Sequence, residues 1–312
     1  MEGRVIRAPQ RLRAVQLVRS ILIIPANRTE LAPKGLAAGA DALIFDLEDA
    51  VAADDKETAR EQLAEFLAGP PVSSIPIFVR VNGLESSLVL ADLRAIVGPQ
   101  LTGVLVPKSE APQDIAVIDR VLGWLETDAD VRLGSVVILP ILETAAGARR
   151  AHDIALASSR TAYMGGLGVR GGDVERSLGY RWSPAGDESF AMRSNVLIDV
   201  RAADVPNPVS GMWADIKDLN GLRAFARQNR GLGYEGMMYI HPSHVSVINE
   251  EFSPTAEELD RDRRLMDAMS SAAAESHGAT VFEGEMIDEA TSITARRRLA
   301  RFGLATSSTR SR

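Results

Sequence analysis

Eight short apolar runs recur along the chain, each followed by a polar loop and a longer amphipathic stretch. They are SILIIP (20–25), ALIFDLED (42–49), IPIFVRVN (75–82), TGVLVPK (102–108), SVVILPILE (135–143), TAYMGGL (161–167), DVPNPVSG (204–211) and EGMMYIHP (235–242). Most are rich in Ile, Val and Leu without alternation, which is typical of strands buried on both faces. The run at 204–211 is the weakest, because its two prolines disfavour a central strand. The pattern therefore predicts parallel strands separated by helices.

Apolar residues recur at helical spacing between these runs. Residues 54–70 predict an amphipathic helix that Gly69-Pro70 ends, and residues 218–233 repeat the pattern. Eight β-α units in roughly 230 residues match the number and size of a TIM (β/α)8 barrel. A doubly wound sheet would also alternate strands and helices, so the number of units carries the preference for the barrel.

The segment after the eighth run has a different pattern. Residues 253–278 predict a long helix, with Thr255 and Glu258 as a capping box and Gly278 as its stop. A short segment, TVFEGEMID, and a final helix through about Phe302 follow. We expect this helical extension to pack on a neighbouring subunit.

The two ends of the chain are polar. Five arginines and a single acid occupy the first 19 residues, which fits a mobile arm or a first helix. A transit peptide is the alternative, but it would also be rich in Ser, and none occurs before Ser20. The predicted organisation is a basic arm (1–18), a barrel (19–250), a C-terminal extension (251–303) and a disordered tail (304–312).

Net charge, the length of the apolar runs and the absence of cysteine disfavour several classes of function. The net charge of −7 disfavours nucleic acid as a partner, and no apolar run is long enough to span a membrane. The chain has no Cys, which excludes disulfides and thiolate catalysis and fits a cytoplasmic location.

Polar residues cluster where the predicted strands end, which is where a TIM barrel carries its active site. They are Asp46, Glu48 and Asp49 after the second run, Arg80 and Asn82 in the third, Lys108 in the fourth, Glu143 in the fifth, Asp173 after the sixth and His241 in the eighth. So many strand ends of this kind predict one shared pocket that holds carboxylates beside Arg and Lys.

The glycine-rich stretch MGGLGVRGGD (164–173) allows three interpretations. Its spacing meets the dinucleotide fingerprint, but Asp173 puts negative charge where a phosphate would sit. A plain flexible loop is the second interpretation. The third is that the glycines let the chain carry Asp173 back over the barrel mouth.

In the third case Glu143 is the natural partner of Asp173. Two carboxylates with waters and substrate oxygens suit Mg²⁺, with Mn²⁺ as an alternative, whereas zinc would prefer His or Cys. Arg80 fits an anion clamp for a carboxylate or enolate, or a buried ion pair with Glu48 or Asp49. Lys108 could form a Schiff base or belong to an ordinary charged loop.

Taken together, these motifs resemble a known family. RSILIIPAN, GADALIFDLEDAV, VRVN, VLVPK, LPILET, GYEGMMYIHPSHVSVINEEFSPT and GEMID occur in order from about residue 19 to residue 302. This set resembles the citrate lyase β-subunit-like enzymes of the HpcH/HpaI aldolase family, which includes malyl-CoA and citramalyl-CoA lyases. The resemblance implies a TIM barrel assembled into a homotrimer or hexamer.

The resemblance also implies roles for individual residues. Glu143 and Asp173 would bind Mg²⁺, Arg80 would contact the substrate carboxylate or enolate, and Glu48 and Asp49 would support both. Asp288 would act as the acid that reaches a neighbouring subunit's site. The residues expected to bind CoA or substrate are Arg19, Lys56, Arg60 and Lys108.

The implied activity is a Mg²⁺-dependent carbon–carbon lyase of retro-Claisen or aldol type. It would cleave or form a hydroxyacyl-CoA such as malyl-CoA or citramalyl-CoA, with acetyl-CoA or propionyl-CoA and glyoxylate or pyruvate as the other partners. Three alternatives stay open: a CoA-independent 2-oxo acid aldolase, a malyl-CoA thioesterase, and the lyase subunit of a citrate lyase complex.

Overall fold

The computed structural model describes residues 17–71, 74–168, 170–183 and 185–302. Nearly all of the predicted arm (1–18) and the whole predicted tail (304–312) lie outside these residues. The chain divides into two compact units, one within Met1–Phe252 and the other within Ser253–Arg312. The predicted boundary between barrel and extension falls two residues before this division.

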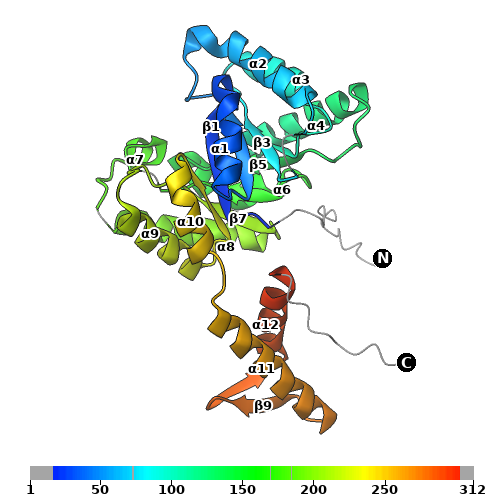
Figure 1. The fold of residues 1–312 in the computed structure, drawn as a ribbon, viewed down its shortest axis with the longest axis vertical. Coiled ribbons are helices and arrows are strands. Elements are labelled where there is room, and N and C mark those ends of the chain that lie inside the picture. Colours follow the sequence, from blue (N-terminus) through cyan, green and yellow to red (C-terminus); the bar gives the residue numbers. More distant parts are fainter. Residues whose placement is uncertain (1–16, 72–73, 169, 184, 303–312) are drawn as a thin grey trace, which may run out of the picture. The chain divides into compact units, whose positions relative to one another are not determined.

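Eight parallel strands form the centre of the first unit (Figure 1). They are β1 (Ser20–Pro25), β2 (Ala42–Asp46), β3 (Ile77–Arg80), β4 (Gly103–Val106), β5 (Val137–Pro140), β6 (Tyr163–Gly165), β7 (Asn207–Ser210) and β8 (Gly236–Tyr239). Their order is β5-β4-β3-β2-β1-β8-β7-β6, and parallel bridges from Ile138 to Thr161 and from Ile141 to Gly165 join the two ends. The sheet is thus rolled into the predicted TIM barrel, and every predicted run contains a strand.

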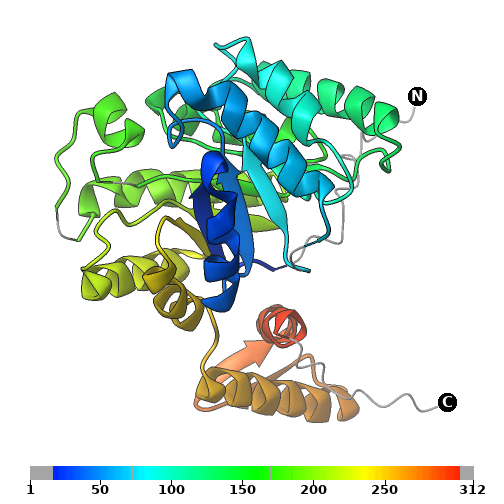
Figure 2. The ribbon, with the colours of Figure 1, turned by 45° about the horizontal axis from the view of Figure 1, so that its top comes forward.

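Helices surround the strands on the outside (Figure 2). The α-helices of this unit are α1 (Ala32–Ala37), α2 (Lys56–Ala68), α3 (Leu88–Ile96), α4 (Pro112–Asp128), α5 (Ala145–Arg149), α6 (Ala151–Leu156), α7 (Asp173–Leu178), α8 (Phe190–Ala202), α9 (Leu219–Leu232) and α10 (Val245–Glu251). The 3₁₀ turns are η1 (Ala26–Leu31), η2 (Ala53–Asp55), η3 (Asp187–Ser189) and η4 (Pro242–His244). The two helices predicted from spacing correspond to α2 and α9.

Successive side chains of each strand enter two separate cores. Ile21 and Ile44 belong to the core inside the barrel, whereas Leu22 and Phe45 belong to the larger core between strands and helices. Inside, the rings of Phe78 from β3 and Tyr163 from β6 meet edge to face with centroids 5.1 Å apart. Because both faces are buried, most strands carry apolar residues on both faces, which explains the missing alternation in the sequence.

Strand β7 is an internal strand of the sheet, paired with β6 and β8, although the two prolines of the run at 204–211 disfavour a central strand. Pro208 is tolerated because the pairing with β8 begins only at the next residue, Val209, opposite Gly236. Pro208 still contributes its carbonyl, which accepts the N–H of Glu235 at 2.9 Å. A proline at the first residues of a strand costs little, since no partner carbonyl waits for its missing N–H.

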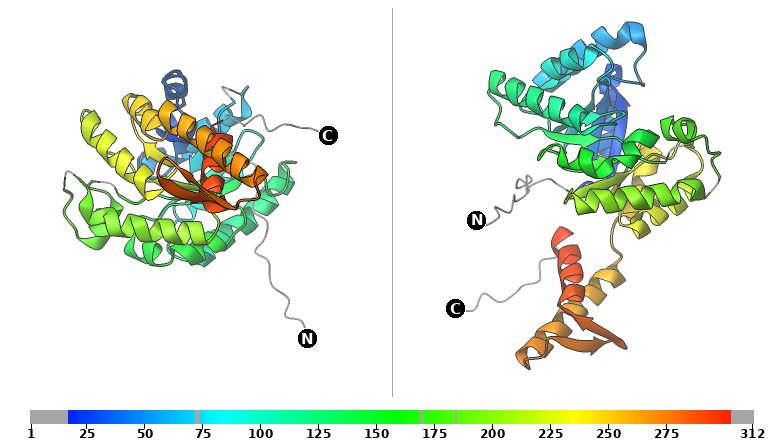
Figure 3. Two further views of the ribbon diagram at one scale, coloured as in Figure 1. Left: turned by 90° about the horizontal axis from the view of Figure 1, so that it is seen from below. Right: turned by 180° about the vertical axis from the view of Figure 1, so that it is seen from behind.

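The second unit contains α11 (Ala256–Ala274), a hairpin of β9 (Ala279–Phe282) and β10 (Glu285–Asp288), and α12 (Glu289–Arg301) (Figure 3). The predicted capping box is confirmed, with Thr255 and Glu258 bonding each other's backbone N–H. The predicted stop at Gly278 is wrong. The helix ends at Ala274 because Ser276 adopts a left-handed conformation (φ 62°) and the His277 N–H turns back to the Ala272 carbonyl.

Within the described ranges, none of the helices combines the length and the apolar character that a membrane crossing would need.

Candidate metal centre and active site

The ends of β2 and β3 bring a carboxylate and a guanidinium together. Asp46 and Arg80 are register partners at the last paired position of the two strands. The Arg80 Nε donates to Asp46 Oδ1 at 2.7 Å, its Nη2 donates to Asp46 Oδ2, and its Nη1 lies 3.0 Å from Glu48 Oε2. Burial lowers the pKa of Arg80. The hydrogen bonds to Asp46 and the charges of Asp46, Glu48 and Glu143 outweigh this effect, so the pKa lies above its ordinary value.

Asp46 is the residue whose role the sequence did not reveal. It is fully buried and also accepts the N–H groups of Glu48 at 2.8 Å and Ala50 at 3.1 Å, so it holds the start of the β2 loop. The sequence-based alternative for Arg80, a buried ion pair with Glu48 or Asp49, is confirmed for Glu48. The pairing of Asp46 with Arg80 could have been predicted from position alone, because each is the last residue of one of two adjacent parallel strands.

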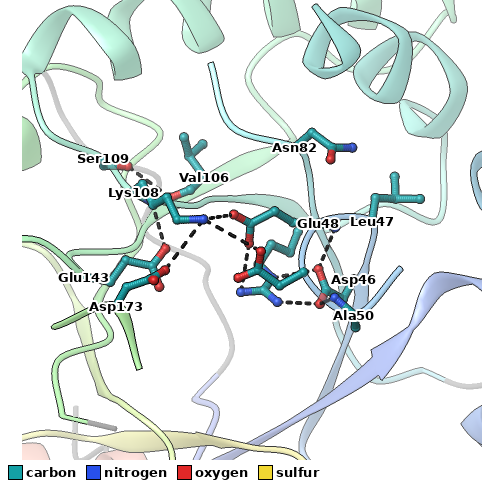
Figure 4. Close-up of polar contacts among 12 residues, drawn as sticks. Asp46, Leu47, Glu48, Ala50, Asn82, Val106, Lys108, Ser109, Glu143 and Asp173 are labelled. Atoms are coloured by element: carbon teal, nitrogen blue, oxygen red, sulfur yellow. Dashed lines mark hydrogen bonds and ion pairs between the residues drawn. The ribbon is translucent and has the colours of Figure 1, made fainter. Parts of the chain in front are cut away.

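Lys108 links the β2 acids to the acids that follow β5 and β6 (Figure 4). Its Nζ donates to Glu48 Oε1 at 2.5 Å and lies 3.8 Å from Asp49 Oδ1 and 3.6 Å from Asp173 Oδ2. Its backbone N–H donates to Glu143 Oε1 at 2.9 Å. Lys108 has a left-handed backbone (φ 45°), which is uncommon for a residue with a Cβ and is typical of functional sites.

Glu143 lies three residues beyond β5, where the Leu142 N–H still pairs with the Gly165 carbonyl at 2.8 Å. Burial raises the pKa of Glu143 to about 7. The hydrogen bond from Lys108 and the charge of Arg80 oppose this shift, while the negative charges of Glu48 and Asp173 add to it. The positive charge near Glu143 is therefore too small to offset the effects of burial and of the neighbouring carboxylates on its pKa.

Asp173 lies beside Glu143 (Figure 4). The chain reaches this position through a run of left-handed glycines that begins at Gly165 (φ 150°) and Gly166 (φ 96°). A Cβ at Gly165 would lie 1.9 Å from the Val209 carbonyl oxygen, so β6 can approach β7 there only without a side chain. Asp173 also forms an ion pair with the exposed Arg176.

The dinucleotide interpretation of this stretch finds no support in the fold. A short helix, α7, does begin at Asp173 directly after the glycines, which the sequence did not predict. However, the strands form a closed barrel rather than a doubly wound sheet, and the first helical residue is an acid facing other acids. The glycines instead deliver Asp173 to Glu143.

The donor set at this place fits a hard divalent cation. The carboxyl groups of Asp46, Glu48, Asp49, Glu143 and Asp173 outnumber the cationic groups of Arg80, Lys108 and Arg176 by two. In the described part of the chain, no three His, Asp or Glu side chains gather closely enough to hold a metal alone. Mg²⁺ does not require this, because it keeps several waters and uses one or two carboxylates.

The remaining predicted ligand-binding residues have partners of their own. The Lys56 Nζ donates to the carbonyls of Leu47 at 2.8 Å and Glu48 at 2.6 Å, which fixes the β2 loop. The Arg60 Nε donates at 2.8 Å to the buried Asp92, which also accepts the backbone and side-chain amides of Asn82. Both cations therefore lie on the mouth side of the barrel, after β2, and both order its loops.

Arg19 lies at the other end of the barrel. It precedes β1 and forms a two-point ion pair with Asp41, which precedes β2. The acids described above follow the carboxyl ends of the strands, so the length of β1 separates Arg19 from the mouth. The geometry favours a structural role for Arg19 and does not support the predicted contact with CoA at its own barrel's mouth.

Asp288 belongs to the second unit, where it is exposed at the start of α12. Its Oδ1 accepts the Thr291 N–H at 3.2 Å and caps the helix. His241 has a comparable local role in the barrel unit, where its Nδ1 accepts the Ser243 N–H at 3.2 Å.

The model of the HpcH/HpaI aldolase/citrate lyase family matches residues 19–242. Citrate lyase subunit beta of Escherichia coli is 31% identical over 283 residues, which cover 91% of this chain and 92% of that protein. A (3S)-malyl-CoA thioesterase of Cereibacter sphaeroides is 31% identical over 285 residues, 91% of this chain and 94% of that one.

A solved structure resembles the chain over nearly its whole length. CitE from Mycobacterium tuberculosis, crystallised in complex with magnesium, acetoacetate and coenzyme A, aligns with a TM-score of 0.73 and 29% identity. The alignment covers 94% of this chain and 100% of that one.

Proposed function

The chain belongs to the HpcH/HpaI aldolase/citrate lyase family and is a lyase, and from this premise we propose that it cleaves carbon–carbon bonds in hydroxyacyl-CoA thioesters with Mg²⁺ as cofactor. The observation that carries the proposal is the pairing of Glu143 with Asp173 beside Arg80 and Lys108, at the carboxyl ends of the barrel strands. The magnesium and coenzyme A in the M. tuberculosis CitE structure support it.

The proposed substrates are malyl-CoA and citramalyl-CoA. Malyl-CoA divides into acetyl-CoA and glyoxylate, and citramalyl-CoA into acetyl-CoA and pyruvate. In each case the hydroxyl group loses its proton and becomes the carbonyl of the oxo acid, while the broken bond leaves its electron pair on the CoA fragment. That enolate then takes up one proton, so the products balance the substrate. A methyl-substituted malyl-CoA gives propionyl-CoA and glyoxylate in the same way.

Glu143 and Asp173 would hold the metal, which supplies Lewis acidity toward substrate oxygens when bound. Arg80 is oriented by two hydrogen bonds to Asp46 and by an ion pair with Glu48, and its remaining N–H groups could serve a substrate oxygen. Since Arg80 is already fixed, little reorganisation is needed when negative charge develops on the substrate.

The proton for the enolate would come from Asp288 of a neighbouring subunit in a homotrimer or hexamer. Support comes from its position: the capping bonds use one carboxyl oxygen, Oδ1, and the side chain is exposed. Lys56, after β2, is the candidate we favour for binding the CoA phosphates. Its ammonium donates to two carbonyl oxygens, which carry no net charge and so do not neutralise it.

A malyl-CoA thioesterase is the second candidate, favoured by the relatives of that name in Cereibacter sphaeroides. A lyase subunit of a citrate lyase complex is the third, favoured by the E. coli relative. A CoA-independent 2-oxo acid aldolase would use the same metal site without CoA.

Product analysis separates these candidates. The purified chain is incubated with malyl-CoA, citramalyl-CoA or the free hydroxy acids, with Mg²⁺ or with EDTA. We expect Mg²⁺-dependent release of acetyl-CoA and an oxo acid. Free CoA with intact malate would establish the thioesterase, and cleavage of free acids only would establish the aldolase. Activity that persists in EDTA and in Asp173→Asn would refute the metal-dependent mechanism.

A further inference from the structure

Among the described residues of the site, Lys108 is the only cationic residue that contacts both the acids after β2 (Glu48 and Asp49) and the acids after β5 and β6 (Glu143 and Asp173). Its ammonium lies 2.5 Å from Glu48 Oε1 and 3.6 Å from Asp173 Oδ2, and its backbone N–H anchors Glu143. Arg176 also contacts Asp173, but its side chain is largely exposed and it reaches none of the β2 acids. One residue thus holds both proposed metal ligands, by its backbone and by its side chain.

The two contacts have opposite consequences for a cation. The backbone N–H orients the Glu143 carboxylate without adding charge. The ammonium, by contrast, neutralises Asp173 and would stand within a few ångströms of any divalent ion bound there, where like charges repel strongly. The left-handed backbone at Lys108 lets both contacts be made from one residue.

From this geometry we infer that Lys108 is the resident counterion of the metal site and sets its Mg²⁺ affinity. Its ammonium competes with the metal for Asp173 and turns toward Glu48 and Asp49 when the metal binds. The role rests on the proposed Mg²⁺ site at Glu143 and Asp173. It makes Lys108 a positioning residue that keeps the acids together and the metal exchangeable, rather than a Schiff-base nucleophile or a contact to CoA.

Metal titration of variants tests this role without any substrate. Mn²⁺ binding is followed by the loss of its free-ion electron paramagnetic resonance signal, and Mg²⁺ by competition. Lys108→Met removes the charge but keeps the length of the side chain, and Lys108→Gly removes the charge where glycine favours the observed backbone. At 3.6 Å even the dielectric constant of water leaves an attraction worth about sevenfold in affinity, and partial burial increases it.

We therefore expect both variants to bind Mn²⁺ at least about sevenfold more tightly than the unaltered chain. Lys108→Arg, which keeps the charge, should stay within about twofold. Lys34→Met, an exposed site on α1, controls for the change in net charge and should also stay within about twofold. Circular dichroism and thermal melting establish that each variant is folded.

The outcomes separate this inference from the proposed function. If the unaltered chain binds Mn²⁺ and Glu143→Gln abolishes binding, the metal site stands. Folded Lys108→Met and Lys108→Gly variants with unchanged or weaker affinity would then overturn the counterion role alone. If the unaltered chain binds no Mn²⁺, the metal site and the counterion role both fail.

Discussion

The raised pKa of Glu143 predicts that metal binding depends steeply on pH near neutrality. Burial is the main cause of the shift to about 7, and the charges of Glu48 and Asp173 add to it. A metal binds the carboxylate and not the carboxylic acid, so protons and metal compete for this side chain. Lowering the pH from 8 to 5.5 therefore protonates Glu143 in the folded protein.

The expected magnitude follows from the ionised fraction. With a pKa of about 7, Glu143 is about 90% ionised at pH 8 and about 3% ionised at pH 5.5, so apparent affinity should fall about 30-fold. A Glu with its ordinary pKa of 4.5 would change its ionised fraction only about 1.1-fold over the same range. The two cases differ by more than a factor of ten.

The assay is a Mn²⁺ titration of the whole protein at half-unit pH intervals, with fold monitored by circular dichroism at each pH. We expect apparent affinity to fall tenfold per pH unit well below pH 7 and to level off above it. Glu143→Gln should bind weakly at every pH and lose the dependence. A folded protein whose affinity changes less than twofold between pH 8 and 5.5 would refute the proposed burial of Glu143 among acids.

Other changes test the remaining parts of the site. The folded-state pKa of Glu143 exceeds its unfolded value, so its contribution to stability is present below about pH 4.5 and is lost as pH rises through about 7. Because the metal binds the ionised carboxylate, Mg²⁺ should raise the melting temperature more at pH 8 than at pH 5.5. An equal rise at both pH values would contradict this. Asp46→Asn leaves Arg80 buried with a weakened partner and should lower the free energy of unfolding by about 3 kcal/mol, measured in urea, and kcat/KM as well; unchanged values of both would show that Asp46 does not orient Arg80. Gly165→Ala forces a Cβ against the Val209 carbonyl and should destabilise the protein by about 3 kcal/mol or prevent folding, so a normal melting temperature would be inconsistent with the close approach of β6 and β7. Asp288→Asn should lower kcat more than it raises KM in a lyase assay; a loss of affinity alone would count against a proton-donor role.

The sequence predicted the barrel well because its strands carry an unusually direct signal. Successive residues such as Ile21 and Leu22 enter different cores, so most strands are apolar on both faces and can be told from the amphipathic helices. The expectation that proline disfavours a central strand was wrong at Pro208, because no carbonyl of the neighbouring strand β8 is placed to accept an N–H there. The predicted helix stop at Gly278 was also wrong, because Ser276 adopted the left-handed turn first.

The candidate site was predictable only in outline. Strand ends show which side chains share the mouth of a barrel, and Glu143 does interact there with Asp173, Arg80 and Lys108. Which acid binds which cation depends on register and on rotamers. The bond of Arg80 to Asp46 and the left-handed backbone of Lys108 have no counterpart in composition or spacing.

Arg19 shows why a role inferred from a motif stays a prediction until the residue is placed in the fold. It stands in the segment RSILIIPAN, which resembles a motif of the family, yet it lies before β1 and pairs with Asp41 at the amino ends of the strands. A motif preserves the order of residues along the chain, whereas the direction of a strand decides which end of the barrel each residue occupies.

The most direct measurement is anomalous diffraction from a crystal of the protein soaked in Mn²⁺. We expect one strong peak at coordination distance, about 2.1 Å, from carboxyl oxygens of both Glu143 and Asp173, with the remaining positions taken by water or substrate. A peak bound by neither acid, or no peak in a crystal whose mouth is open to solvent, would contradict this expectation.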